Sequence, residues 1–204
     1  DDNGALIFPE QFLPIAQEFG LSSRVDLWVL ERTLSFLAQH RQRLPGQSFA
    51  INLAPSTAYR AQFPLEVSRL LAKYAVEAWQ LIFEVTESSA FGHADLAAST
   101  LRKLQKMGIR IAIDDFGTGH SALIYLEHFT MDYLKIDRGF VNAIGTETVT
   151  SPVLDAVLTL ARRLNMSTVA EGVETPEQAA WLREHGVNFL QGYWISRPMP
   201  LAQF

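Results

Sequence analysis

Six short apolar runs in this chain each end in one polar residue that can bind a metal ion or move a proton. The six polar residues lie between 20 and 36 residues apart, about the length of one strand, one helix and the loops that join them. Strands connected in this way lie parallel, so their carboxyl ends meet at one edge of a sheet. The pattern therefore predicts an active-site ring made of Asn52, Glu84, Asp114, Lys135, Glu171 and Gln191.

Helical segments alternate with these strands. One helix should begin at Pro9 and a second should run from Arg24 to Arg43; later ones are expected over 65–74, 94–107, 121–128, 152–164 and 176–185. Glycines at 20, 108 and 186 are typical of helix ends, and Thr175 before a proline and an acid is typical of a helix start. Such alternation forms an open doubly wound sheet or a barrel. Functional residues on every strand favour the barrel, because an open sheet concentrates its site at one switch point.

The number of strands is too small for a closed barrel. We count six in 204 residues, whereas a complete barrel has eight strands in about 250 residues. We therefore expect an α/β fold of the modified TIM (β/α)8 barrel type, in which the N-terminal strands precede Asp1 in a longer parent protein.

Composition restricts the metal and the partner. The chain has no cysteine, and its five histidines are not spaced as helix or strand metal ligands, so oxygen ligands and a hard cation such as Mg²⁺ or Mn²⁺ are favoured. The formal net charge of -5 argues against a nucleic acid polymer or an anionic membrane surface as partner. It does not exclude a small anionic ligand, because bound cations reverse the local sign of charge.

The sequence Asp114-Asp115-Phe116-Gly117-Thr118-Gly119 is the most specific motif. Adjacent side chains point to opposite faces of an extended strand, but two carboxylates at a strand tip can each hold a cation or share one. The alternative is a solvated turn before a helix. Other candidates also have simpler readings: Asn52 as a loop amide, Lys135 in a salt bridge to Asp137 or a rim acid, and Gln191 packed in the core.

Together these motifs resemble bacterial EAL domains over nearly the whole chain. The matching segments are Ile51-Asn52-Leu53, Glu84-Val85-Thr86-Glu87, Asp114 to Gly119, Lys135-Ile136-Asp137, Glu171-Gly172-Val173-Glu174, Gln191-Gly192-Tyr193 and Ser196-Arg197-Pro198. The resemblance implies an EAL domain over residues 1–204, incomplete at its N-terminus, that hydrolyses cyclic di-GMP to linear pGpG with two Mg²⁺ or Mn²⁺ ions. Ca²⁺ is expected to inhibit hydrolysis.

The resemblance also implies roles for individual residues. The implied metal ligands are Asn52, Glu84, Asp114, Asp115 and Glu171. Lys135 resembles the lysine that contacts the nucleophilic water, and Glu171 resembles the acid described as its general base. Glu87 resembles the anchor of the loop after Gly119. Gln191 resembles part of the metal and water network, and Asp137 and Glu174 are further expected cofactor-site residues, Glu174 chiefly through positioning its loop.

The chain departs from the EAL pattern in three places. His120 stands where tyrosine is common and Ala122 where serine is common, and both changes look tolerable. The Glu-Ala-Leu segment itself is absent; we expect it upstream of Asp1, with its glutamate as a further metal ligand. If the parent protein lacks it, cyclic di-GMP binding without hydrolysis becomes the better interpretation. A purely protein-binding domain is a third hypothesis, which the intact acidic ring disfavours.

The biological setting is expected from the same resemblance. It implies a homodimer, an upstream sensor domain, and a cytoplasmic domain whose parent protein can be anchored in the inner membrane.

Overall fold

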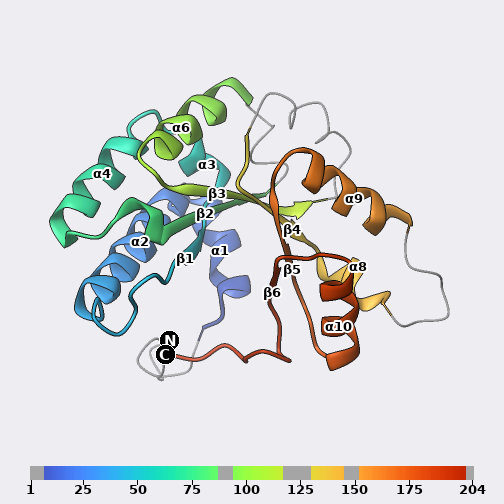
Figure 1. The fold of residues 1–204 in the computed structure, drawn as a ribbon. Coiled ribbons are helices and arrows are strands. Elements are labelled where there is room, and N and C mark those ends of the chain that lie inside the picture. The colour runs from blue at the N-terminus through green and yellow to red at the C-terminus, as the bar shows by residue number, and fades with distance from the viewer. Residues whose placement is uncertain (1–6, 87–93, 117–129, 145–151, 201–204) are drawn as a thin grey trace. The chain divides into compact units, whose positions relative to one another are not determined.

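The computed structural model describes residues 7–86, 94–116, 130–144 and 152–200 (Figure 1). The chain divides into two compact units: the first unit is residues 1–85 with 92–109, and the second unit is residues 86–91 with 110–204. The helix expected over 121–128, the glycines of the Asp-Asp motif, and Glu87 lie outside the described residues. None of the described helices is long and apolar enough to cross a membrane.

The first unit is built from helices around a parallel strand pair. Its elements are α1 (Pro9–Glu18), α2 (Ser22–Gln39), β1 (Phe49–Asn52), α3 (Pro55–Ala58), α4 (Phe63–Tyr74), the 3₁₀ helix η1 (Ala78–Gln80), β2 (Leu81–Thr86) and α6 (Ala94–Lys106). Leu30 and Leu34 of α2 are fully buried, and the rings of Phe63 and Phe83 lie 5.6 Å apart. Leu30 and Leu34 thus belong to the packing face of α2, whereas Trp28 of the same helix is 64% exposed.

The register of β1 and β2 places two predicted site residues level with each other. Asn52 pairs with Glu84 in parallel register, and the backbone N–H of Leu53 donates to the Glu84 carbonyl at 2.8 Å. Along β2 the buried residues alternate, with Leu81, Phe83 and Val85 inward. Both polar residues thus lie at the carboxyl end of their strand pair, as expected.

The second unit contains four parallel strands and three described helices. Its elements are β3 (Arg110–Phe116), β4 (Tyr133–Ile136), α8 (Arg138–Asn142), α9 (Pro152–Arg163), β5 (Ser167–Ala170), α10 (Pro176–Glu184) and β6 (Phe189–Leu190). β4 pairs with both β3 and β5, and β5 pairs with β6. Three consecutive β3 residues, Ile111, Ala112 and Ile113, are buried, which is typical of a parallel strand covered on both faces.

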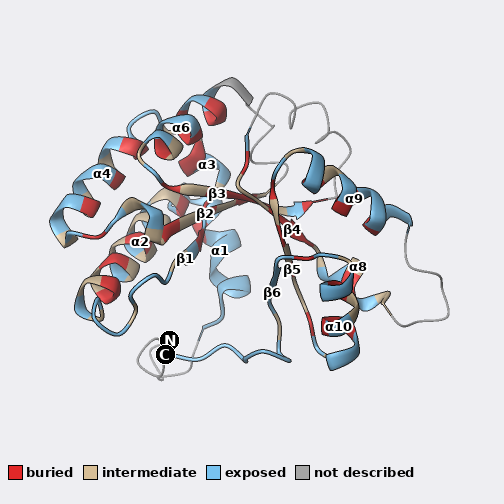
Figure 2. Ribbon diagram, viewed as in Figure 1, coloured by how far each residue is buried: buried red, intermediate tan, exposed pale blue. Residues whose placement is uncertain are grey.

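The predicted helix boundaries that fall within the described residues are confirmed to within a few residues. Gly108 and Gly186 follow α6 and α10 with φ angles of 94° and 80°, a left-handed conformation that glycine adopts without strain. Thr175 caps α10, with its hydroxyl accepting from the Gln178 N–H at 3.2 Å. Figure 2 shows buried residues along the strands and on one side of the helices within each unit.

Candidate metal-binding site

Three carboxylates meet at the carboxyl ends of strands in the second unit. Asp114 and Asp115 belong to the end of β3, and Glu171 directly follows β5. One oxygen atom of each lies within 4.8 Å of the others. The structure therefore brings three of the five predicted metal ligands into one cluster.

A backbone irregularity in β3 places both aspartates in this cluster. The β3–β4 register shifts between Ile113 and Phe116, and Asp115 has a left-handed φ of 54°. Aspartate is among the few non-glycine residues that tolerate this conformation. The Asp115 N–H donates to Asp114 Oδ1 at 3.0 Å. The irregularity breaks the alternation of the strand, so neighbouring carboxylates share one end of it.

A buried lysine joins the cluster from β4. Lys135 is only 3% exposed, and its Nζ lies 2.7 Å from Glu171 Oε1 and 3.1 Å from Asp114 Oδ1. A buried ammonium is costly without opposite charge, and the two carboxylates supply it. The alternative interpretation of Lys135, a salt bridge to a rim acid, is confirmed.

The charges of the cluster suit a divalent cation. Burial raises the pKa of Asp115, the negative charges of Asp114 and Asp137 raise it further, and Lys135 opposes them. The carboxylates outnumber the ammonium, so the cluster keeps excess negative charge. Hard cations prefer such carboxylate oxygens. The donor set therefore fits a metal ion, which would also relieve the repulsion between the aspartates.

The remaining predicted ligands belong to the first unit. Asn52 is exposed and Glu84 is partly buried, at paired positions of β1 and β2. An amide and a carboxylate at adjacent strand ends can contribute neutral and charged oxygen donors to a hard cation.

The loop that follows Glu171 is fixed by backbone contacts. The Gln191 N–H donates to the Ala170 carbonyl at 2.8 Å, and the Val173 N–H donates to the Gln191 carbonyl at 3.0 Å. A Cβ on Gly192 would lie 2.2 Å from the Val173 carbonyl oxygen. Glycine at position 192 therefore permits the close approach of the Val173 backbone.

The other expected cofactor-site residues shape loops. Asp137 Oδ1 accepts from the Gly139 N–H at 2.8 Å and caps α8. Glu174 is exposed, and its backbone N–H donates to Gln178 Oε1 at 2.8 Å; the expected loop-positioning role of its side chain stays a prediction. Gln191 is exposed, so the alternative that its side chain packs in the core is wrong.

Two supporting residues were missed by the sequence analysis. Gln178 forms a capping box with Thr175, and the Thr-x-x-Gln pattern could have revealed it. Asp26 accepts a hydrogen bond from the Ala54 N–H, 28 residues away. No local pattern indicates that contact, because Asp26 lies within an ordinary amphipathic helix.

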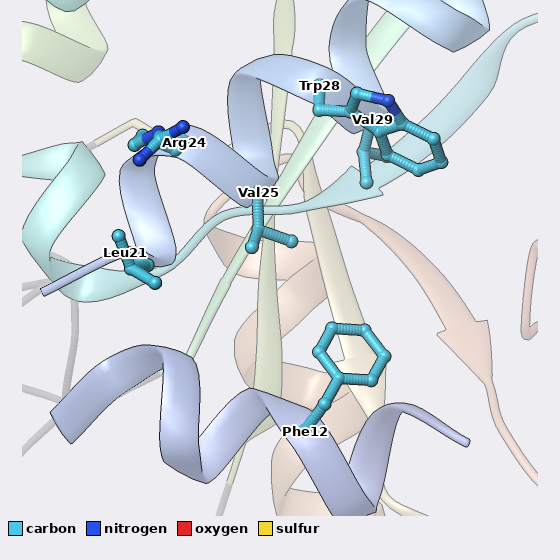
Figure 3. A pocket seen from close by; sticks show the side chains of 6 residues that line it. All are labelled: Phe12, Leu21, Arg24, Val25, Trp28 and Val29. Atoms are coloured by element: carbon cyan, nitrogen blue, oxygen red, sulfur yellow. The ribbon is translucent and has the colours of Figure 1, made fainter. Parts of the chain in front are cut away.

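The first unit also contains a mainly apolar pocket. It has a volume of about 410 Å³ and lies between α1 and α2 (Figure 3). Its lining is mainly apolar and consists of Phe12, Leu21, Arg24, Val25, Trp28 and Val29. None of the predicted site residues lines it, so we do not assign the candidate function to this pocket.

Comparison with known proteins agrees with the motifs. The EAL domain family model matches residues 1–198. A probable cyclic di-GMP phosphodiesterase of Escherichia coli K12, PdeN, is 53% identical over 197 residues, covering 96% of this chain and 38% of PdeN. The cyclic di-GMP phosphodiesterase PdeF of the same organism is 48% identical over 200 residues, covering 98% of this chain and 27% of PdeF. The chain thus spans less than half the length of either relative.

Solved structures give the same result for the fold. A structure described as the PaMucR phosphodiesterase in a c-di-GMP complex matches with a TM-score of 0.92 and 38% identity, covering 100% of this chain and 83% of that one. This match confirms the expected α/β fold of the modified TIM-barrel type. From its family match and its relatives, the chain belongs to the EAL domain family.

Proposed function

We propose that this domain hydrolyses cyclic di-GMP to linear pGpG with two divalent metal ions, Mg²⁺ or Mn²⁺. The observation that carries the proposal is the cluster of Asp114, Asp115 and Glu171 around the buried Lys135. Its support is membership of the EAL family and the names of relatives such as PdeN and PdeF. A phosphodiester is anionic, so an acidic cluster can receive it only when cations compensate the charge.

The proposed metal ligands are Asn52, Glu84, Asp114, Asp115 and Glu171. Divalent ions, when bound, lower the pKa of water and neutralise charge that develops on the phosphate. Asp114 has an oxygen atom close to those of Asp115 and Glu171, which makes it suitable as a shared ligand. The glutamate of an upstream Glu-Ala-Leu segment would add to this set.

Lys135 and Glu171 are the proposed catalytic residues. Water supplies the oxygen that bonds to phosphorus, and the bond from phosphorus to the ribose 3′ oxygen breaks. Glu171 can accept a proton from the attacking water. The leaving ribose 3′ oxygen takes up a proton from solvent. Lys135 Nζ, held 2.7 Å from Glu171 Oε1, can donate a hydrogen bond to the water or to a phosphate oxygen.

The other proposed site residues act through loops. Asp137 shapes the start of α8 after Lys135, Glu174 belongs to the loop after Glu171, and Gln191 holds that loop through its backbone. Glu87 is retained as a proposed anchor of the loop after Gly119.

The setting of the domain is proposed from the family resemblance. Ca²⁺ should occupy the site without supporting turnover. We further propose a homodimer in the cytoplasm, controlled by an upstream sensor domain in a parent protein that can be attached to the inner membrane.

The direct test is hydrolysis of cyclic di-GMP by the intact protein and by Asp114→Ala. Chromatography should show linear pGpG from the wild type with Mg²⁺ and none above background from the variant. Asp155→Ala, which removes an exposed carboxylate from α9, is the matched control and should retain turnover.

Two results would contradict this proposal. Turnover by Asp114→Ala at the wild-type rate would exclude the assigned site. Calorimetry that detects cyclic di-GMP binding with Ca²⁺, in a wild-type protein without turnover in Mg²⁺ or Mn²⁺, would instead identify a non-catalytic cyclic di-GMP receptor.

A further inference from the structure

We propose that Asp26 is a positioning residue, which holds the loop after β1 so that Asn52 presents its amide oxygen to a metal ion. This inference rests on the proposed function, because it takes Asn52 as a metal ligand. Asp26 lies on α2, outside every motif that the sequence analysis identified. It acts on Asn52 through the loop backbone and does not itself touch the ion.

One carboxylate oxygen of Asp26 makes two contacts with the segment after β1. Asp26 Oδ2 accepts from the Ala54 N–H at 2.9 Å and from the Thr57 hydroxyl. Thr57 is fully buried in α3, and its hydroxyl also lies 3.0 Å from Ser23 Oγ on α2. The carboxylate therefore joins α2 to the short loop and the helix that follow Asn52.

Hydrogen bonds at successive residues hold the backbone segment that contains Asn52. Its own position pairs with Glu84 in the strand register, the Leu53 N–H donates to the Glu84 carbonyl at 2.8 Å, and the Ala54 N–H donates to Asp26. Pro55 then starts α3 and has no N–H to contribute. The Asp26 contact thus tethers the backbone two residues after Asn52, where the chain leaves the strand end.

A positioning role for Asp26 requires a hydrogen-bond acceptor rather than a charge. Burial raises the pKa of Asp26, and this effect is larger than the lowering by the hydrogen bonds from Thr57 and Ala54. The environment therefore disfavours the charged form overall. What the carboxyl group contributes is an accepting oxygen at a fixed place, and a neutral amide oxygen could do the same.

A second carboxylate on α2 provides a matched comparison. Glu31 Oε1 accepts from Lys73 Nζ at 2.6 Å and from the Tyr74 hydroxyl at 3.0 Å, so it joins α2 to the end of α4. Both carboxylates link α2 to another helix of the first unit. The Asp26 link also includes the backbone of Ala54, close to Asn52, whereas Glu31 accepts its described hydrogen bonds from α4.

The test measures Mn²⁺ affinity of the intact protein from the electron paramagnetic resonance signal of the free ion, which is independent of turnover. Asp26→Ala should weaken Mn²⁺ binding about tenfold, the effect expected for loss of a residue that orients a metal ligand. Asp26→Asn should stay within about twofold of the wild type, because its amide oxygen can accept both bonds. Glu31→Ala should bind Mn²⁺ as the wild type does.

Further variants separate positioning from folding. Thr57→Val keeps the Ala54 contact and should weaken Mn²⁺ binding by only about two- to threefold, a fraction of the loss for a full tether. It provides the comparison with the wild type if Asp26→Ala does not fold. Hydrogen exchange at the Leu53 and Ala54 amides should quicken in Asp26→Ala and stay unchanged in Glu31→Ala.

The inference would be overturned if folded Asp26→Ala bound Mn²⁺ as tightly as Glu31→Ala, or if Asp26→Asn lost as much affinity as Asp26→Ala. After either of these two outcomes, Mn²⁺ binding and cyclic di-GMP hydrolysis by the wild-type protein would still support the proposed function. A wild-type protein that binds neither Mn²⁺ nor Mg²⁺ would overturn both proposals together.

Discussion

At the strand ends of the second unit, three carboxylates lie close together beside a buried ammonium group, whereas the strand ends of the first unit carry one amide and one carboxylate in paired register. Side-chain charge organises the former: Lys135 bridges Asp114 and Glu171. The backbone organises the latter, through the β1–β2 register and the hydrogen bonds of Leu53 and Ala54.

This difference suggests that the two units contribute differently to the proposed site. The second unit has a charge cluster that its own lysine compensates only in part, and the remaining negative charge can attract a cation. The first unit presents oxygen donors whose direction depends on loop geometry. We therefore expect substitutions in the second unit to act mainly on charge and catalysis, and substitutions in the first unit to act mainly on metal affinity.

After Asp114→Ala, the largest effect should come from Lys135→Met. Turnover should fall by about 10²- to 10³-fold, as for loss of a preorganised donor at a developing charge. In a chelator the variant should also lose about 2 kcal/mol of unfolding free energy, less than the ~3–5 kcal/mol for breaking a fully buried pair. The carboxylates are partly exposed, at 13% and 19%, which reduces the cost.

Lys73→Met is the matched control for Lys135, because it removes an exposed ion pair with Glu31. It should leave the free energy of unfolding and the turnover close to the wild-type values, because solvent screens an exposed pair. Urea titrations with and without Mg²⁺, together with the hydrolysis assay, measure both quantities. Equal behaviour of the two lysine variants would remove the distinction between the buried cluster and an ordinary surface pair.

Asn52→Ala, in the first unit, should have the next largest effect, which should be on metal affinity. We expect a loss of about tenfold or more in Mn²⁺ affinity, comparable with other changes in the surroundings of a metal ion. Raised Mg²⁺ should restore much of the turnover. The exposed Ser56→Ala on α3 serves as control. A metal titration in which Asn52→Ala matches Ser56→Ala would remove Asn52 from the ligand set.

Gly192→Ala should perturb the loop after Glu171 more modestly. The added Cβ would lie 2.2 Å from the Val173 carbonyl oxygen, so the backbone must move, at a cost of about 1–3 kcal/mol as in overpacked sites. Turnover should fall several-fold through displacement of Glu171. Gly20→Ala, with a φ of 65° but no atom within 4 Å of the new Cβ, should lose about 1 kcal/mol and keep turnover.

Thermal unfolding and initial rates of both glycine variants check this prediction. An unperturbed Gly192→Ala would mean that the Val173 contact does not fix the loop.

The smallest effect should be the pH dependence contributed by Asp26. Its pKa is raised in the folded state, chiefly by burial. Between the ordinary aspartate pKa of 3.8 and the raised value, the folded protein binds more protons than the unfolded one, so stability from this group falls as pH rises. The free energy of unfolding of the wild type, relative to Asp26→Asn, should therefore decrease across that window.

Denaturant titrations of the two proteins at matched pH values measure this difference. A relative stability of the wild type that increases with pH in the same window would reverse the assigned direction of the Asp26 shift.

The strands were predictable because a short local sequence pattern marks each of them. The apolar runs before Asn52, Glu84 and Asp114 mark β1, β2 and β3 directly. Gly108 and Gly186 mark helix ends because their conformation disfavours other residues. The short helices α3 and α8 were not predicted, since four and five residues are too few to show a helical period.

The site was predictable in its residues but not in its geometry. Nothing in the sequence indicates that the left-handed Asp115 would bring adjacent carboxylates to the same strand end. Asp26 was missed because its contact with Ala54 is made by folding, across 28 residues. The upstream Glu-Ala-Leu strand and the role of Glu87 stay predictions.

The most direct test of the account is anomalous diffraction from crystals of the intact protein soaked with Mn²⁺ and cyclic di-GMP. We predict manganese peaks within coordination distance of Asp114 and Asp115, with Asn52 and Glu84 among the ligands. Manganese bound elsewhere, with no peak coordinated by either aspartate in crystals that hold the nucleotide, would contradict the assignment of the acidic cluster as the metal-binding and catalytic centre.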